Sequence, residues 1–216
     1  DATKEGLLRI AQANKKVHLV TNYENYYFAL GNNIGVANAR GEYVILLNND
    51  TEVQPGWLPA LIEPFHQDPD VGVVGAKLLF PDRTVQHAGI VFSDRSKIPY
   101  HIYKGVPHDA PCVKKSRTFQ AVTGACMAVR AVDYIRLRGL DPRYANGCED
   151  IDFCLRLATI LHKKILYSPE STIIHHEGKT EGRSKFIMYN RETLVELWGY
   201  KIQADDQKYF DEDGFR

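Results

Sequence analysis

The chain has 216 residues, of which 44% are hydrophobic and 25% are charged, so it can bury a sizeable core and disorder is not expected. Because 27 Lys and Arg residues balance 27 Asp and Glu residues, the formal net charge is +0, which argues against a general nucleic-acid-binding protein. No apolar run approaches the length of a membrane span, and the four cysteines include no C-x-x-C pair, as is typical of reduced thiols in a cytoplasmic protein.

Helical and strand patterns alternate along the chain. In order, we expect a helix over residues 3–14, a strand over 17–20, a helix over 28–38, a strand over 43–47, a helix over 55–67 and a strand over 71–80. There follow a polar loop or excursion over 92–118, a strand over 119–129, helices over 131–138 and 149–161, strands over 165–167 and 172–175, and a helix over 186–200. This alternation predicts an α/β fold in one domain, with a mostly parallel sheet and helices on both faces.

The most informative segment is the strand predicted at 43–47 together with the residues after it. Its sequence, YVILL, is typical of a strand buried on both faces, and it ends at Asn48, Asn49 and Asp50. In open α/β sheets, ligands bind at the carboxyl ends of strands. Oxygen-bearing side chains at such a place suit a hard divalent cation, and a turn with Asp50 capping the next helix is an equal alternative.

A second cluster of polar side chains opens the helix predicted at 149–161. Glu149, Asp150 and Asp152 fall in its first turn, where a carboxylate offsets the helix dipole by about 0.3–1 kcal/mol. Three like charges in one turn exceed what capping requires, so one carboxylate aimed into a cleft could act as a general base for a hydroxyl nucleophile. Compensation of the helix dipole alone is the competing interpretation.

A pair of histidines, His175 and His176, ends the strand predicted at 172–175. One imidazole could complete a cation site that Asp50 begins, although a structural role is the more common one for such a pair. Zinc is less favoured, because no second His or Cys cluster lies at zinc-like spacing.

Taken in order, these clusters and their flanking segments resemble the family 2 inverting glycosyltransferases of the GT-A fold, especially the bacterial rhamnosyltransferase-like members. The similar segments are NYYFALGNNIG at 25–35, ARGEY at 39–43, LNND at 47–50, TGACMAVR at 123–130, GLDPRY at 139–144 and GCEDIDFCLR at 147–156. The last segment is the most specific, and the resemblance extends over most of the chain. Tyr27, Gly31 and Asn48 depart from the family pattern, Asn48 standing where many relatives have Asp.

The resemblance implies a role for each matching residue. Asp150 would be the general base, and Glu149 would orient it or the acceptor. Asp50 and His175 would hold a divalent cation, Mn²⁺ or Mg²⁺, with His176 as the competing ligand. The nucleotide-sugar donor and its diphosphate would contact Asn48, Asn49, Asp50, Gly124, Ala125 and Arg183.

The function that the resemblance implies is metal-dependent, inverting transfer of a sugar from a UDP- or dTDP-linked donor to a hydroxyl of a glycan or lipid-linked acceptor. Bacterial polysaccharide biosynthesis in the cytoplasm is the expected setting, with peripheral association at the inner face of the membrane as an option. One alternative is a sugar-phosphate nucleotidyltransferase, although the Gly-rich basic loop near the N-terminus of those enzymes is absent here. A non-catalytic binding module that keeps the fold is the other alternative.

Three further segments have competing interpretations. The polar stretch over 93–115, which contains Tyr100, His101, Tyr103 and His108, could contact acceptor sugars or form a surface loop. The basic run over 179–185 could be a lid over the diphosphate or a solvated loop. Residues 1–3 are similar to the end of an N-terminal family motif, which implies that the first strand, first helix and second strand of the family precede residue 1. Such a fragment would expose a sheet edge and have weak or absent activity alone.

Overall fold

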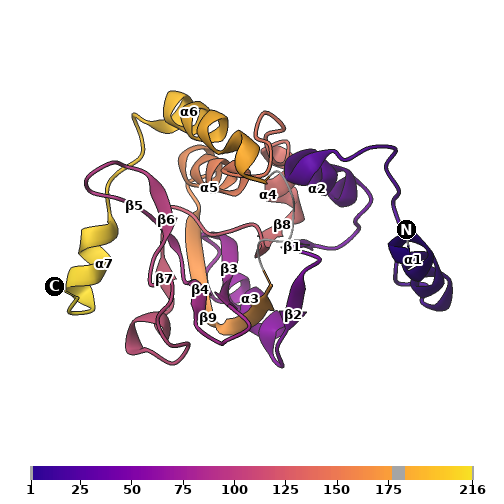
Figure 1. The fold of residues 1–216 in the computed structure, drawn as a ribbon, viewed down its shortest axis with the longest axis horizontal. Coiled ribbons are helices and arrows are strands. Elements are labelled where there is room, and N and C mark those ends of the chain that lie inside the picture. The colour runs from indigo at the N-terminus through magenta and orange to yellow at the C-terminus, as the bar shows by residue number, and fades with distance from the viewer. Residues whose placement is uncertain (1, 177–182, 216) are drawn as a thin grey trace.

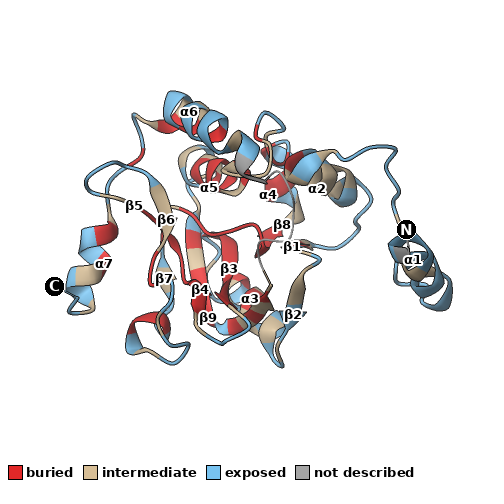
Figure 2. Ribbon diagram, in the orientation of Figure 1, coloured by how far each residue is buried: buried red, intermediate tan, exposed pale blue. Residues whose placement is uncertain are grey.

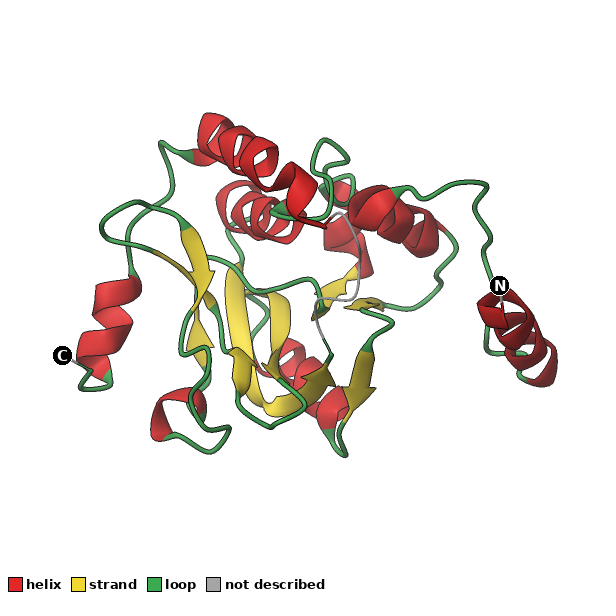
Figure 3. Ribbon diagram, viewed as in Figure 1, coloured by secondary structure: helices red, strands yellow, loops and turns green. Residues whose placement is uncertain are grey.

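The computed structural model describes residues 2–176 and 183–215, and Figure 3 shows its helices, strands and loops. The helices are α1 (Ala2–Ala13), α2 (Tyr27–Ala37), α3 (Trp57–Gln67), α4 (Ala131–Arg136), α5 (Glu149–Ile160), α6 (Ile187–Trp198) and α7 (Asp206–Glu212), with 3-10 turns η1 (Pro111–Val113) and η2 (Arg183–Phe186). The strands are β1 (Tyr43–Leu47), β2 (Thr51–Val53), β3 (Val71–Leu79), β4 (Val85–His87), β5 (Ile90–Phe92), β6 (Pro99–His101), β7 (Arg117–Thr118), β8 (Cys126–Arg130) and β9 (Lys164–His175).

The main sheet has the strand order β1-β8-β3-β9-β2, with β4 added to β3 and β7 added to β9 (Figure 1). The α/β expectation is confirmed, but the expectation of a mostly parallel sheet is wrong for the described residues. Among the strand pairs recorded there, β3 with β9 is parallel, and the others are antiparallel. Apolar runs show that strands are buried, but they do not show the direction in which neighbouring strands run.

Helices cover both faces of this sheet. Alternate residues of β3 and β8 point to opposite faces: Val73 and Met127 join a core cluster with α5 and α6, whereas Val74 and Ala128 join a cluster with α3. The buried strands therefore form the middle layer, as Figure 2 shows by their colour. Helix α1 stands apart from this core in Figure 1.

No helix in the described part of the chain is both long enough and apolar enough to cross a membrane.

Several expected strands differ from those observed. Residues 17–20 form no strand and are largely exposed, because a short apolar run without a partner strand gains little burial. Burial alternates in β1, which pairs with β8 at one end of the sheet, so the expected burial on both faces is wrong. The strand expected over 119–129 begins at Cys126, and the two strands expected near the C-terminus are one strand, β9, with an irregular register opposite Ala76 and Lys77.

The excursion over 92–118 contains more regular structure than expected. Strands β5 and β6 form a small antiparallel sheet. Val91 of β5 and Ile102, which follows β6, belong to a third apolar cluster together with Tyr209 of α7, a helix that the sequence patterns did not reveal. The Asp206 carboxylate accepts hydrogen bonds from the backbone N–H of Asp94 and from the Tyr100 hydroxyl. Helix α7 therefore holds this hairpin against the sheet.

Candidate active site

Strand pairing brings the predicted site residues together. Because β1 and β8 are antiparallel, the end of β1 meets the start of β8, and the backbone N–H of Asn48 donates to the carbonyl of Ala125 at 2.9 Å. Strand β2 pairs with β9 so that Thr51 lies opposite His175, and the backbone N–H of His176 donates to the carbonyl of Asp50 at 2.9 Å. Three segments far apart in the sequence therefore meet at one edge of the sheet.

These segments line an open cavity of about 220 Å³. Its lining includes most of the residues that the sequence singled out, together with others that it did not. The lining residues are Phe28, Asn48, Asn49, Asp50, Leu78, Gln86, His101, Thr123, Gly124, Ala125, Asn146, Gly147, Glu149, Asp150 and His175. A concave site with converging carboxylate, amide and imidazole groups is typical of a small-molecule binding site.

Asp50 and His175 face each other in this cavity. The Nε2 atom of His175 lies 3.1 Å from Oδ1 of Asp50 and 3.2 Å from the amide nitrogen of Asn48. His175 is 4% exposed, and its Nδ1 atom lies 2.6 Å from Oε1 of Gln86. His176 instead contacts Glu52 at 2.7 Å and does not line the cavity. The structure therefore brings His175, and not His176, to Asp50.

The separation of the Asp50 and His175 side chains would suit two adjacent ligands of one divalent cation. Two ligands on adjacent positions of an octahedral Mg²⁺, each about 2.0–2.1 Å from the ion, are about 3 Å apart, which matches the separation of these two atoms. Among the described residues, no group of three or more His, Cys, Asp and Glu side chains forms a cluster that could hold a metal ion. One or two protein ligands are nevertheless sufficient for a cation that also binds a diphosphate.

Asp150 lies beside the strand-end turn that carries Gly124. Its Oδ2 atom accepts a hydrogen bond of 2.8 Å from the backbone N–H of Gly124, and its Oδ1 atom accepts one of 2.9 Å from the backbone N–H of Ile151. Residues 124 and 125 form the turn before β8, and were expected within a strand. The carboxylate is thus held by two backbone donors, with the cavity beside it.

The segment before α5 carries backbone conformations that are uncommon for residues with side chains. Asn146 and Cys148 have φ angles of 54° and 71°. The amide oxygen of Asn146 accepts from the backbone N–H of Phe28, and Glu149, which is 5% exposed, accepts from the backbone N–H of Gly147 at 2.6 Å. Burial raises the pKa of the Cys148 thiol to about 12, so this cysteine is no nucleophile near neutral pH.

Gly124 is a position where a side chain would change the cavity. An added Cβ would lie 3.0 Å from the Phe28 ring and 3.4 Å from Cβ of Asp150. We expect Gly124→Ala to lower the free energy of unfolding by about 1–3 kcal/mol, because the half-buried Phe28 ring must move. Guanidinium chloride denaturation checks this, with Gly31→Ala as the control, since nothing lies within 4 Å of that position in α2. Equal stability of the two variants would contradict the expectation.

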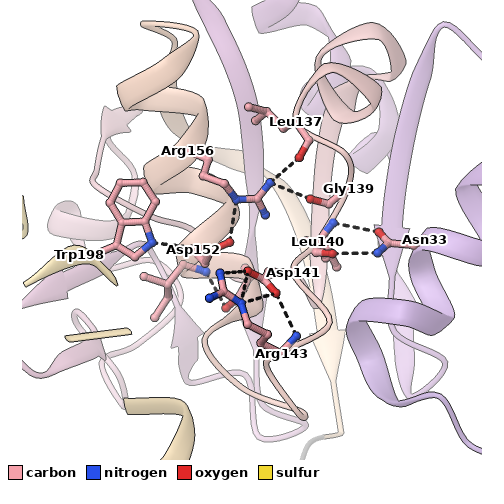
Figure 4. Close-up of polar contacts among 11 residues, drawn as sticks. Asn33, Leu137, Gly139, Leu140, Asp141, Arg143, Asp152, Arg156 and Trp198 are labelled. Atoms are coloured by element: carbon pink, nitrogen blue, oxygen red, sulfur yellow. Dashed lines mark hydrogen bonds and ion pairs between the residues drawn. The ribbon is translucent and has the colours of Figure 1, made fainter. Parts of the chain in front are cut away.

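The third carboxylate of the helix start, Asp152, does not line the cavity. Its side chain leaves α5 toward α6. Its Oδ1 atom accepts from the indole N–H of Trp198 at 2.7 Å, and its Oδ2 atom accepts from Arg156 at 2.7 Å (Figure 4). Arg156 also donates to the carbonyls of Leu137 and Gly139. Asp152 therefore ties α6 and the turn after α4 to the helix that presents Glu149 and Asp150.

Sequence patterns missed part of the cavity lining. Gln86 sits in a short strand with no motif, and Phe28 and Asn146 gave no separate signal. His101 was noted only as part of a polar stretch. It contacts His87. Burial lowers the pKa of His87 well below its usual range, and the Nε2 atom of His87 faces the backbone N–H of Thr123 at 3.4 Å.

Residues 179–182 and the side chain of Arg183 lie outside the described residues, so the basic run stays a prediction.

A mixed α/β sheet with helices on both faces, which gathers acidic side chains at its strand ends, is the architecture of GT-A glycosyltransferases. The chain belongs to glycosyl transferase family 2, whose model matches residues 1–109. It is 36% identical over 152 residues to the O-antigen biosynthesis protein RfbC of Myxococcus xanthus, covering 68% of this chain and 12% of that protein.

Further relatives agree with this assignment. The chain is 24% identical over 175 residues to N-acetylglucosaminyl-diphospho-decaprenol L-rhamnosyltransferase of Mycobacterium tuberculosis, covering 72% of this chain and 55% of that protein. It therefore spans little more than half of one relative and about an eighth of the other.

Solved structures show the same fold. Mannosyltransferase PcManGT from Pyrobaculum calidifontis, in complex with GDP-Man and Mn²⁺, superposes with a TM-score of 0.62 at 17% identity, covering 100% of this chain and 57% of that chain. GalNAc-T7 with UDP, GalNAc and Mn²⁺ superposes with a TM-score of 0.61 at 14% identity, covering 92% and 44%.

Proposed function

We propose that this chain carries, in one domain, the catalytic site of a metal-dependent inverting glycosyltransferase. The site would transfer a sugar from a nucleotide-diphospho-sugar to a hydroxyl of a glycan or lipid-linked acceptor. The observation that carries the proposal is the joint placement of the Asp50–His175 pair and Asp150 in one cavity. Glu149 and the strand-end turn at Gly124 and Ala125 complete its wall.

The names of similar proteins support the substrate classes. An O-antigen biosynthesis protein and a rhamnosyltransferase whose acceptor is a sugar on a lipid diphosphate favour bacterial polysaccharide assembly. The two superposed structures hold UDP or a GDP-linked sugar with Mn²⁺, which favours a nucleotide-linked donor and a divalent cation. An acceptor on a lipid would fit work at the inner face of the membrane by a protein that associates with it peripherally.

In this proposal each residue acts by its own chemistry. Asp50 and His175 would hold the cation, which when bound offsets the negative charge that grows on the departing nucleoside diphosphate. Asn48 and Asn49, which line the cavity, would offer amide groups to that diphosphate, and Gly124, which has no side chain, would let the donor sugar approach the backbone. Arg183 would add positive charge to the same diphosphate.

Asp150 would act on the acceptor. Its carboxylate would take the proton of the attacking hydroxyl while the hydroxyl oxygen bonds to the anomeric carbon, and the bond from that carbon to the diphosphate oxygen breaks on the opposite face of the sugar. A single displacement of this kind inverts the anomeric configuration. Glu149, held by the backbone N–H of Gly147, would orient the acceptor or Asp150.

Calorimetric titration with Mn²⁺, followed by UDP, dTDP and GDP, tests the donor half of the proposal. We expect Mn²⁺-dependent binding of one of these nucleotides, and Asp50→Ala should remove most of it because the cation loses its carboxylate ligand. Glu52→Ala is the matched control, since that carboxylate is exposed and contacts His176 outside the cavity.

Other results would redirect the proposal. A nucleotide affinity that changes neither when Mn²⁺ is removed nor in Asp50→Ala would contradict a metal-dependent transferase. Release of diphosphate from a nucleoside triphosphate and a sugar phosphate would indicate a nucleotidyltransferase instead. Nucleotide or sugar binding without turnover in any combination of donor and acceptor would favour a binding module.

A further inference from the structure

Gln86 of β4 contacts His175 at two points. Its amide nitrogen donates to the backbone carbonyl of His175 at 3.2 Å, and its amide oxygen lies 2.6 Å from the ring atom Nδ1. Both residues are buried, Gln86 being 2% exposed and His175 4% exposed. Neither contact was foreseeable from spacing, because β4 reaches β9 through β3 in the sheet.

The backbone carbonyl decides the orientation of the Gln86 amide. A carbonyl oxygen only accepts hydrogen bonds, so the NH₂ group of Gln86 must face it, and the amide oxygen must face Nδ1 of His175. An amide oxygen also only accepts, so Nδ1 must carry the ring proton. In the neutral imidazole, Nε2 therefore has a free lone pair.

That lone pair points toward Asn48 and Asp50. The Asn48 amide can donate to it across 3.2 Å, but the Asp50 carboxylate oxygen at 3.1 Å is another acceptor. Two acceptors at this distance repel each other unless a cation or a proton lies between them. This arrangement is the one that a metal-ligating histidine needs, with its remote nitrogen held by a second polar group.

We propose that Gln86 is a positioning residue that fixes the tautomer and ring orientation of His175, so that Nε2 stays available as a cation ligand beside Asp50. The role toward the cation rests on the proposed function, whereas the role in the tautomer does not. Without Gln86, His175 can place its proton on Nε2 and donate to Asp50, which closes the site to a cation.

The first test measures the tautomer in the metal-free protein. Long-range ¹H–¹⁵N NMR spectra distinguish protonated Nδ1 from protonated Nε2, and the signals of His175 are identified by their loss in His175→Gln. We expect protonated Nδ1 in the unmodified protein and in Gln86→Glu, whose carboxylate still accepts from Nδ1. In Gln86→Leu we expect a shift toward protonated Nε2. Gln120→Leu is the matched control, because Gln120 makes a similar two-point amide contact with Gln203, outside the cavity.

The second test titrates Mn²⁺ alone into the same variants. Gln86→Leu should weaken Mn²⁺ binding by about 10–100-fold, and Gln86→Glu and Gln120→Leu should retain it. Protonated Nε2 in the unmodified protein, or an unchanged tautomer in Gln86→Leu, would overturn the proposal. A tautomer shift in Gln86→Leu, in a protein that never binds Mn²⁺, would support the role of Gln86 in the tautomer and overturn the metal-dependent function.

Discussion

Asp150→Asn is expected to lower the turnover number for sugar transfer by about 10²–10⁴-fold, because an amide cannot take the proton of the acceptor hydroxyl. The measurement is release of nucleoside diphosphate from the nucleotide sugar selected by titration, with acceptors of the proposed classes, glycans and lipid-linked sugars. Asn keeps the size of the side chain, and its one oxygen can keep one of the two contacts that the carboxylate oxygens make with the backbone N–H groups of Gly124 and Ile151. We expect the loss to fall mainly on turnover.

A second readout separates catalysis from folding and donor binding. Affinity for Mn²⁺ should stay within a few-fold of the unmodified protein, because Asp150 is no part of the Asp50–His175 pair. Asp141→Asn serves as the control, since that carboxylate pairs with Arg143 and does not line the cavity. Unchanged turnover in Asp150→Asn would remove this residue from the role of general base.

The strand-end part of the site was predictable from sequence, and the reason is physical. An apolar run that stops at Asn48, Asn49 and Asp50 marks the end of a strand. Because β1 and β3 are both antiparallel to β8, and β3 is parallel to β9, the strands β1, β3 and β9 run in the same direction, so the carboxyl ends of β1 and β9 lie at the same edge of the sheet. The mixed direction of the strands therefore did not disturb the prediction. The choice between His175 and His176 could not be made, because it depends on which of the two faces the cavity.

Contacts between distant segments were not predictable in the same way. Gln86 is one polar residue in a three-residue strand, and its importance arises only when β9 places His175 against it. Likewise, the acidic cluster at the start of α5 divides between two environments. Glu149 and Asp150 line the cavity, whereas Asp152 turns beneath the helix toward Trp198. Helix periodicity indicates that these side chains point in different directions, but not what each one meets.

The burial of Asp152 leads to the largest expected effect on stability. Two Asp–Arg pairs with similar shortest N–O distances lie near each other in Figure 4, Asp152 with Arg156 at 2.7 Å and Asp141 with Arg143 at 2.6 Å. Their exposure differs: the side chains of Asp152 and Arg156 are 2% and 15% exposed, whereas those of Asp141 and Arg143 are 17% and 57% exposed. We expect Asp152→Ala to lower the free energy of unfolding by about 3–5 kcal/mol, because Arg156 loses its counter-charge in a buried place.

Asp141→Ala, in contrast, should cost no more than about 1 kcal/mol, because water screens the charge of Arg143, whose side chain is 57% exposed. Guanidinium chloride denaturation of both variants at one temperature compares the two costs. If Asp152→Ala does not fold, Asp152→Asn gives the smaller change, since Asn can still accept from the Trp198 indole. Replacing both Asp152 and Arg156 by apolar residues should recover part of the loss, because no unpaired charge then remains buried. Equal costs for the buried and exposed pairs would show that Asp152 does not hold α6 against α5.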